Sequence, residues 1–496
     1  FSFDITDELS EQDIQQITVC ADDDPLDLTK PRGKQDWQPK PHSIWYPRTT
    51  GIWQTVWIEK VPSTYIWRIR WTPAVERWEI GFETHLAGAN ADQMRLQVVL
   101  SCDGKVLADD TYEVINQEVH RRIVLSDPGI DDYRNELLWS PEKPTLIQAT
   151  LRLFCKGEML DEISSYTALR TFSVNRGRFL LNGRPYYMRL VLDQGYWPET
   201  LMTAPSTEAL RKDIEIAKEA GFNGARKHQK IEDPDYLYWA DTLGFLVWEE
   251  MPSCYRFTHD SVDRLMREWT EALERDMNHP CIAVWVPFNE SWGVPDLADK
   301  AAHQSCVQAM YHLTKTLDPT RPVIGNDGWE SIATDILGIH DYDDQPERLL
   351  KKYGRERLGP ETLDRYRPGG RVLTVEGYPH SGQPVMLTEF GGITCIQMTP
   401  GDDRQIWGYS VCKTPEEFRQ RYEELLGSIH QIECLAGFCY TQLVDSFQEA
   451  NGLFRGDRSP NFPLSSMIRA TRGIGNLRGE LSTVPQPPPL PDLEMP

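Results

Sequence analysis

The sequence predicts a multidomain protein in which antiparallel β-sandwich structure is followed by a (β/α)8 barrel. Three observations support this fold class. The chain has 496 residues, which is more than one hydrophobic core usually serves. Apolar and polar residues alternate with a period of two up to about residue 170, as in antiparallel sandwiches. After Thr171, short apolar strands alternate with helical segments, which is typical of a parallel sheet covered by helices.

The first part of the chain contains short predicted strands separated by turns. They lie at Gln16–Val19, Gly51–Glu59, Trp78–Glu83, Met94–Leu100 and Thr145–Phe154. A break near residues 59–62 leaves a first piece too short for a sandwich alone and a second piece of about immunoglobulin-domain size. We therefore expect an immunoglobulin-like β-sandwich before the barrel.

The second part contains eight apolar segments, most of them separated by a predicted helix. They are Tyr186–Leu192, Phe222–Arg226, Phe245–Glu250, Cys281–Glu290, Arg321–Asn326, Asp335–His340, Val385–Glu389 and Leu435–Tyr440. One helix is predicted from its cap at Ser206 to Ala220, where Gly221 stops it. Eight parallel strands in about 300 residues close into a barrel. An open doubly wound sheet is disfavoured, because no glycine-rich dinucleotide-binding turn follows the first strand.

Composition restricts the partners and the compartment. The 75 acidic and 52 basic residues give a formal charge of -23, which repels nucleic acids and anionic membrane surfaces. No apolar stretch is long enough to predict a membrane span. The 10 cysteines form no C-x-x-C pair and no His/Cys cluster, so neither zinc nor a disulfide framework is indicated, and reduced thiols favour a cytoplasmic location.

The two ends of the sequence carry separate expectations. The chain begins with Phe1 in what reads as the middle of a domain, so we expect the true N-terminus to be missing. Residues 483–496 are rich in proline and are predicted to form an extended tail.

Two glutamates carry the predicted chemistry, because each follows an apolar strand. Glu290 ends the fourth barrel strand, and Glu389 ends the seventh. The carboxyl ends of barrel strands form the active-site face, so the two carboxylates are expected to face each other across the mouth. Such a pair can cleave a glycosidic bond, one as proton donor and the other as nucleophile or base.

These motifs resemble glycoside hydrolase family 2. Asn289-Glu290 and Thr388–Gly391 look like the family's acid/base and nucleophile motifs, and Gly221–His228 and Ala240–Glu250 are similar to its second and third barrel segments. Tyr46–Trp57 is similar to the last strands of the family's sugar-binding jelly roll. The resemblance implies a partial jelly-roll domain at 1–60, an immunoglobulin-like sandwich at 61–171 and a catalytic barrel at 172–482.

The resemblance also implies roles for the residues at the barrel mouth. Glu290 is the expected acid/base and Glu389 the nucleophile, with retention at the anomeric carbon. Nearby Trp285, Phe288 and Trp292 would favour the protonated form of Glu290. Further substrate-binding candidates are Arg226 beside the nucleophile, Asn289 toward the 2-hydroxyl, Tyr342, Asp193, Gln194, Trp292, His228, Trp329, Glu330 and Tyr440. For Asp193 a helix-capping role, and for Tyr342 a plain loop position, are the alternatives.

The leading hypothesis is an exo-acting retaining β-glycosidase, with β-galactosidase first among the sugars. A β-mannosidase, β-glucuronidase or furanosidase on the same scaffold, or a catalytically silent carbohydrate-binding protein, are the alternatives. The Asn-x-Lys signature of the family's glucuronidases does not occur in the chain, which disfavours a uronic acid. Met251-Pro252 follows Glu250 where some family galactosidases supply a metal ligand, so we expect no metal and no other cofactor. The expected partners are a carbohydrate substrate and further copies of the chain in a homo-oligomer, with no nucleic acid or membrane.

Overall fold

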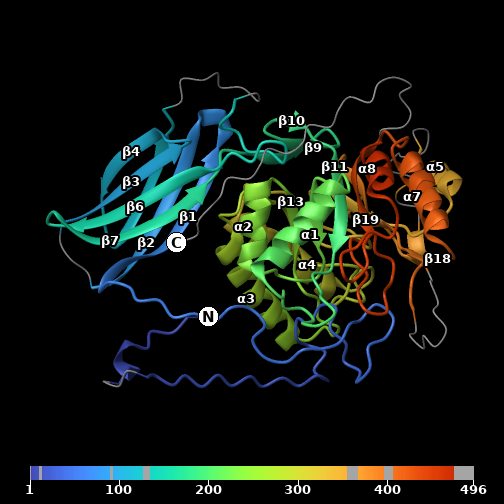
Figure 1. Cartoon of the computed structure of the whole chain (residues 1–496), viewed down its shortest axis with the longest axis horizontal. Coiled ribbons are helices and arrows are strands. Elements are labelled where there is room, and N and C mark those ends of the chain that lie inside the picture. The colour runs from blue at the N-terminus through green and yellow to red at the C-terminus, as the bar shows by residue number, and fades with distance from the viewer. Residues whose placement is uncertain are drawn as a thin grey trace.

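The computed structural model describes residues 2–10, 14–89, 93–126, 135–354, 363, 367–395 and 406–473. The predicted tail at 483–496 and the last part of the predicted barrel domain lie outside these residues. Figure 1 shows a β-sandwich beside a helix-covered barrel, with the N-terminal segment (blue) running along the lower side of both. The described helices include none that is long and apolar enough to cross a membrane.

The sandwich consists of seven antiparallel strands in two sheets. They are β1 (Thr64–Ala74), β2 (Glu79–Gly88), β3 (Met94–Cys102), β4 (Lys105–Glu113), β5 (Glu118–Val124), β6 (Ile147–Cys155) and β7 (Glu158–Thr167), with a 3-10 helix, η2 (Val75–Arg77), after β1. The sheet orders are β1-β2-β5 and β4-β3-β6-β7. Phe82, Val98 and Leu151 from the two sheets share one buried core, as alternation with a period of two requires. The two-sheet prediction is confirmed, while its immunoglobulin-like assignment stays a prediction.

The N-terminal segment differs from its predicted secondary structure. Apart from a short 3-10 helix, η1 (Thr6–Glu8), the described residues before 61 form only isolated bridges, so the strands predicted at 16–19 and 51–59 are wrong. A strand persists only when its backbone is paired and one face is buried. Trp57 is instead 73% exposed, so no sheet packs against this stretch. The jelly-roll assignment of residues 1–60 stays a prediction.

The barrel strands form a parallel sheet. They are β11 (Met188–Asp193), β12 (Gly224–Lys227), β13 (Leu246–Glu250), β14 (Ile282–Val286), β15 (Leu337–His340), β16 (Val385–Gly391) and β19 (Leu435–Thr441), in the order β14-β13-β12-β11-β19-β16-β15. A small antiparallel sheet, β10-β9-β8, precedes them and comprises β8 (Phe172–Asn175), β9 (Arg178–Leu181) and β10 (Arg184–Pro185). A pair of parallel strands, β17 (Ile393–Cys395) and β18 (Ser410–Cys412), lies beyond β16. Seven of the eight predicted barrel strands are thus confirmed.

The remaining predicted strand, Arg321–Asn326, is the fifth in chain order. It closes the sheet without forming a continuous strand. Its Pro322 has no N–H to donate, which limits the ladder. The N–H of Trp285 in β14 donates to the carbonyl of Pro322 (3.1 Å), and the N–H of Ile324 donates to the carbonyl of Trp285 (2.9 Å). On the other side, the end of β15 donates to the carbonyl of Gly328 (3.4 Å). The segment therefore lies between the two edge strands, β14 and β15.

Helices cover the outside of the barrel (Figure 1). They are α1 (Thr207–Glu219), α2 (Pro234–Leu243), α3 (His259–Asp276), α4 (Ala301–Leu317), α5 (Pro346–Tyr353), α7 (Pro415–Ile429) and α8 (Leu464–Arg472), with a 3-10 helix, η3 (Pro368–Gly370). The predicted first helix is confirmed at both ends. The side chain of Ser206 accepts from the N–H of Ala209, and Gly221 adopts a φ of +97° that favours glycine.

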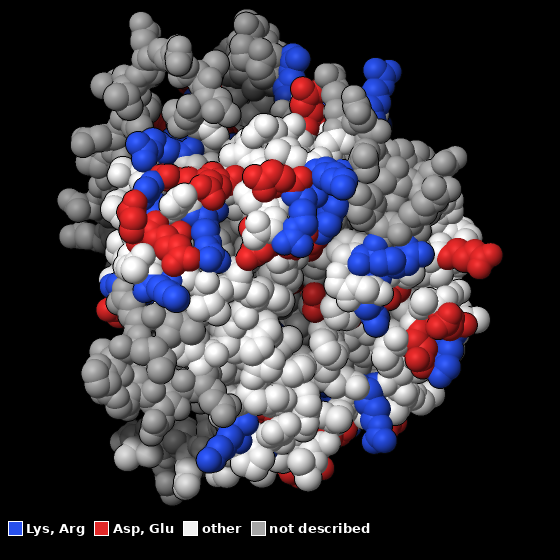
Figure 2. Space-filling view, turned by 90° about the vertical axis from the view of Figure 1, so that its right-hand side faces the viewer, with Lys and Arg blue, Asp and Glu red and all other residues white. Residues whose placement is uncertain are grey.

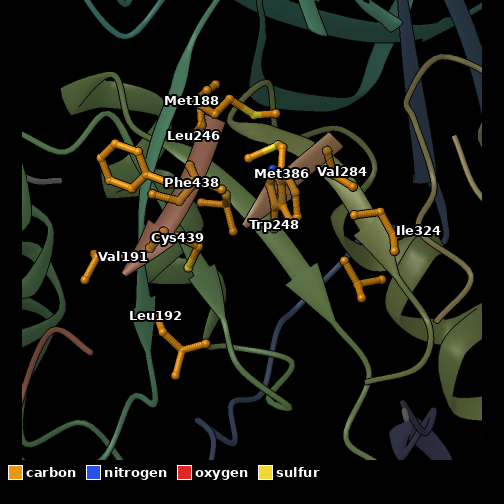
Figure 3. Close-up of a cluster of buried hydrophobic side chains, with 14 of the residues drawn as sticks. Met188, Val191, Leu192, Leu246, Trp248, Val284, Ile324, Met386, Phe438 and Cys439 are labelled. Atoms are coloured by element: carbon orange, nitrogen blue, oxygen red, sulfur yellow. The ribbon is translucent and has the colours of Figure 1, made fainter. Parts of the chain in front are cut away.

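Apolar side chains from several strands fill the barrel below its mouth. Figure 3 shows Leu246, Trp248, Val284 and Met386 in one cluster of buried side chains, and all four are fully buried. Close packing of this kind fixes the strands relative to one another. The side chains at the strand ends are therefore held on a rigid frame.

Hydrogen bonds of Asn278 are among the contacts that join the sandwich to the barrel. Asn278, which follows α3, accepts from the N–H of Trp71 (2.9 Å) and donates to the carbonyl of Ile69 (2.8 Å). On the barrel face shown in Figure 2, acidic and basic side chains are interspersed along the upper part, and the lower part is mostly uncharged. That face presents both signs of charge side by side.

Candidate active site

Both predicted catalytic glutamates lie at the mouth of the barrel. Glu389 is inside β16, near its carboxyl end. Glu290 does not end a strand, because β14 stops at Val286; it lies in the turn beyond, with a left-handed φ of +50°. A non-glycine residue in this conformation is strained, and the N–H of Glu290 is held by the carbonyl of Asp327 (2.9 Å). One carboxylate oxygen of Glu290, one of Glu389 and a ring nitrogen of His340 all lie within 4.8 Å of one another.

Arg226, at the end of β12, connects the nucleophile candidate to its surroundings. Its side chain is fully buried, and its Nη1 lies 3.0 Å from Oε1 of Glu389. The guanidinium also pairs with Glu250 (2.6 Å) and Asp327 (2.9 Å), and it donates to Oδ1 of Asn289 (2.5 Å). A planar guanidinium with five donors can hold these groups at once. Arg226 thus orients Glu389 and turns the Asn289 carbonyl inward, which leaves the amide N–H groups of Asn289 as donors.

Tyr342 binds the other oxygen of the same carboxylate. Its hydroxyl donates to Oε2 of Glu389 (2.6 Å) and lies 3.2 Å from the hydroxyl of Thr441. Its ring stacks on Tyr409 with centroids 3.3 Å apart and an interplanar angle of 5°. Each oxygen of Glu389 therefore has its own donor, Arg226 for one and Tyr342 for the other.

His340 is the main site residue that the sequence analysis missed. Its Nδ1 lies 2.7 Å from Oε1 of Glu290 and 3.5 Å from Oε2 of Glu389, and its Nε2 lies 3.5 Å from Asp327. Burial lowers the pKa of His340, but the three carboxylates outweigh burial and raise that pKa to about 10. His340 was visible as the polar end of the predicted sixth strand, by the same signal that identified Glu290 and Glu389.

The cluster of Glu290, His340 and Glu389 has the composition of a metal site. A pKa of about 10 favours the protonated imidazole, which has no lone pair for a metal. The protonated ring places a positive charge beside both carboxylates.

Trp292 lies against the acid candidate, as expected. Its indole N–H donates to Oε2 of Glu290 (3.3 Å). Its ring lies beside Trp329 (centroids 6.1 Å apart) and beside Trp45 from the N-terminal segment (5.8 Å). The structure thus brings two predicted aromatic residues together at the edge of the mouth and adds a third from the other end of the chain.

Two other aromatic candidates point away from the pocket. Tyr440 is fully buried, and its ring packs against Tyr422 of α7 with centroids 4.9 Å apart. Successive side chains of a strand point to opposite faces, so Thr441 faces the pocket and Tyr440 faces the helices. The indole of Trp285 donates to Asp318 (2.9 Å) in the outer layer. The expected contacts of Tyr440 with substrate and of Trp285 with Glu290 are therefore corrected.

His228 and Asp193 have different positions relative to the pocket. His228 lines it, with Nδ1 3.1 Å from Glu250 and 3.9 Å from Glu389. Burial lowers the pKa of His228 well below its usual value, so the imidazole is neutral. The carboxylate of Asp193 is taken up by Lys227 (2.9 Å) and is not among the pocket-lining groups. Asp193 thus has a structural ion pair, and the helix that follows it is capped by Ser206 instead.

The pocket between these residues has a volume of about 280 Å³. Part of its wall comes from residues that the sequence analysis did not single out, namely Lys34, Ile44, Gln229, Tyr409 and Glu449. Lys34 and Ile44 come from the N-terminal segment and Glu449 from the loop after β19. No local pattern links these segments, because only the folded chain brings them together.

Known proteins are similar to parts of this chain. Residues 172–391 match the family described as glycosyl hydrolases family 2, TIM barrel domain. A putative β-glucuronidase of Formosa agariphila is 27% identical over 286 residues, which cover 55% of this chain and 33% of that protein. A β-galactosidase of Thermoanaerobacter pseudethanolicus is 26% identical over 337 residues, which cover 66% of this chain and 42% of that protein.

Solved structures show the same fold. The family 2 β-galacturonidase of Eisenbergiella tayi superposes with a TM-score of 0.64 at 20% identity, covering 85% of this chain and 74% of that one. The chain spans less than half the length of the two curated relatives that it matches. The matched barrel holds both glutamates and the arginine that binds one of them. The chain therefore carries the TIM barrel domain of the glycosyl hydrolases family 2.

Proposed function

We propose that the chain is a retaining, exo-acting β-glycosidase that removes terminal non-reducing sugar residues. The observation that carries this proposal is the spacing of Glu290 and Glu389, whose nearest carboxylate oxygens lie within 4.8 Å. Retaining glycosidases hold their two carboxyl groups about 5 to 5.5 Å apart, whereas inverting enzymes need about 6.5 to 9.5 Å to admit a water molecule. The spacing supports double displacement.

In the first step, a carboxylate oxygen of Glu389 attacks the anomeric carbon while Glu290 donates its proton to the departing oxygen. The glycosidic bond breaks and a covalent glycosyl ester forms on Glu389. In the second step, Glu290 takes a proton from water, the water oxygen attacks the anomeric carbon, and Glu389 leaves. Two inversions give net retention. Arg226 and Tyr342 hold Glu389 in the attacking position throughout.

His340 supports the proton transfers of Glu290. Once Glu290 has lost its proton, the imidazolium 2.7 Å away stabilises the new carboxylate. The pair can hold one or two protons, which suits a group that alternates between acid and base. Asn289 acts on the carbon next to the reacting one. Its side-chain oxygen accepts from Arg226, so its amide N–H groups can donate to the 2-hydroxyl of the sugar.

The walls of the pocket support exo action. Lys34 and Ile44 of the N-terminal segment and Glu449 of the loop after β19 line it together with the two glutamates, so several segments surround a bound sugar unit. A β-galactosidase is the first choice, and the Thermoanaerobacter relative carries that name. A β-glucuronidase is the second candidate, because the Formosa relative carries that name.

A panel of aryl β-glycosides tests the proposal directly. The protein is expected to cleave at least one of them, and Glu389→Gln is expected to abolish turnover. Proton NMR of the first product should show the β-anomer. Turnover of no sugar by the folded wild-type protein contradicts the enzymatic proposal, and a first product with the α-anomer contradicts retention.

A further inference from the structure

A third carboxylate in the pocket has no role in the two-step reaction. Glu449 lies in the loop after β19, and its side chain is only 3% exposed. The hydroxyl of Tyr46 donates to its Oε2 (2.5 Å), and the amide of Asn451 lies 3.4 Å from its Oε1. Since two carboxylates suffice for double displacement, a third one in the same pocket needs another explanation.

Lys34 lies opposite this carboxylate and comes from the far end of the chain. Its side chain is 5% exposed, and its Nζ lies 4.0 Å from Oε2 of Glu449, which is too far for a hydrogen bond. In the described part of the chain, no side chain or carbonyl accepts a hydrogen bond from this ammonium group. Lys34 lines the pocket, so a bound ligand is the available source of acceptors.

The backbone that carries Lys34 is fixed against the barrel. The N–H of Gly33 donates to the carbonyl of Ser253 (3.0 Å). Gly33 has a φ of +56°, and a Cβ at this position would lie 2.4 Å from the carbonyl oxygen of Gln229. Only glycine permits this close approach. The ammonium group is therefore held in place before any ligand binds.

We propose that Lys34 and Glu449 together bind a hydroxyl group of the sugar and select neutral hexosides over uronides. This inference rests on the proposed glycosidase function. A hydroxyl can accept from the ammonium and donate to the carboxylate at the same time. An oxygen at about 2.8 Å from both atoms fits the 4.0 Å gap between them.

The rest of the pocket wall favours the same class of ligand. The Oε1 of Gln194 is buried without a hydrogen-bond partner in the described structure, and Gln194 lines the pocket. A sugar hydroxyl can donate to this oxygen, whereas the ionised carboxylate group of a uronide has only acceptors.

The test compares two substrates that differ only at carbon 6: 4-nitrophenyl β-D-galactopyranoside and the matching galacturonide. A glucoside and glucuronide pair serves as the second comparison. For the wild-type protein, kcat/KM for the neutral member of the better pair should exceed that for the uronide by at least ~10-fold. Preference for the uronide in both pairs overturns the inference.

Two variants then locate the selectivity. Glu449→Gln and Lys34→Met should each lower kcat/KM for the neutral substrate by about 10- to 100-fold, and Glu449→Gln should also reduce its preference over the uronide. Glu424→Gln on α7 and Lys212→Met on α1, both exposed, are the matched controls and should change neither value. An unchanged ratio of kcat/KM between the neutral substrate and the uronide in Glu449→Gln contradicts the role of Glu449. A general loss of structure lowers kcat/KM for both substrates alike and leaves that ratio unchanged.

The failure of this inference can be told apart from failure of the proposed function. Cleavage of the uronide alone, abolished by Glu389→Gln, would support the proposed glycosidase function and contradict the proposed selectivity for neutral hexosides. Absence of turnover on all four substrates, with no labelling of Glu389 by 2-deoxy-2-fluoro glycosides, would contradict both the glycosidase function and the selectivity. The wild-type ratio decides the selectivity even where a variant fails to fold.

Discussion

The Nδ1 atom of His340 lies 2.7 Å from Oε1 of Glu290, so the acid candidate and an imidazolium share one hydrogen bond. Asp327 lies on the far side of the same ring, 3.5 Å from Nε2. The three groups form one contiguous chain of contacts at the barrel mouth. Substitutions of the site residues, and the dependence of stability on pH, distinguish the roles of these residues.

Replacing the acid should make activity depend on the leaving group. Glu290→Ala should lower kcat/KM by about 10²- to 10⁴-fold for glycosides with poor leaving groups and much less for a dinitrophenyl glycoside, which needs no protonation. Azide fits the space left by the side chain, so it should restore turnover and give a β-glycosyl azide. Glu219→Ala, at an exposed position in the last turn of α1, is the control. An α-azide product would assign the nucleophile role to Glu290 and contradict the scheme.

Removing the tyrosine hydroxyl should slow the reaction while the fold persists. Tyr342→Phe loses the 2.6 Å hydrogen bond to Glu389, and bonds to charged groups contribute about 1.5 to 3 kcal/mol, so kcat/KM should fall by about 10- to 150-fold. Steady-state kinetics on an aryl glycoside measure the loss. Tyr311→Phe removes a hydroxyl that is bound 2.8 Å from Asp335 in the outer layer, and it should leave kcat/KM unchanged. Equal losses in both variants would show that the effect is not specific to the site.

The imidazolium should stabilise the barrel in a pH-dependent way. The folded-state pKa of His340, about 10, lies above the ordinary histidine value of 6.5, so its stabilising contribution is complete below pH 6.5 and is lost as pH rises through 10. The contribution is up to about 5 kcal/mol. Chemical unfolding should show that the difference in free energy of unfolding between the wild type and His340→Gln decreases from pH 6 to pH 10. The exposed His312→Gln on α4 should show no such trend, and a gap that widens with pH would contradict the assignment.

A buried carboxyl outside the pocket should limit stability at high pH. Glu249 in β13 faces α3, and its two carboxylate oxygens have no hydrogen-bond donor in the described structure. Burial, and to a smaller extent the nearby Asp276, raises the pKa of Glu249 well above its usual value. The folded state therefore binds a proton that the unfolded state releases, so stability falls as pH rises above the unfolded value of 4.5. Glu249→Gln keeps the neutral form, and it should raise the midpoint of thermal unfolding at pH 8 by a few degrees with kcat/KM unchanged. A lower midpoint at pH 8 would show that the ionised form is the stable one.

Local patterns predicted much of the barrel. Ser206 and Gly221 bound the first helix in the sequence and in the structure, because capping depends on neighbouring residues alone. Apolar runs predicted the strands for the same reason. The exception was Arg321–Asn326, where Pro322 prevents a continuous ladder although the segment still lies between β14 and β15.

The N-terminal segment was less predictable. Alternation at 51–59 is typical of a strand, but strand formation also requires a partner strand, which a local pattern does not report. Tyr440 shows the same limit on a smaller scale. Its position at the end of β19 was apparent from the sequence, whereas the face to which its ring points depends on the register of the barrel.

By itself, the sequence determined that two carboxylates, Glu290 and Glu389, stand near the ends of separate apolar strands of one barrel. It could do so because strand periodicity and chemical type are local properties. The tertiary structure alone decided that His340 lies between the glutamates and that Lys34 meets Glu449 across the pocket. These contacts join residues far apart along the chain, and the path of the backbone sets their distances.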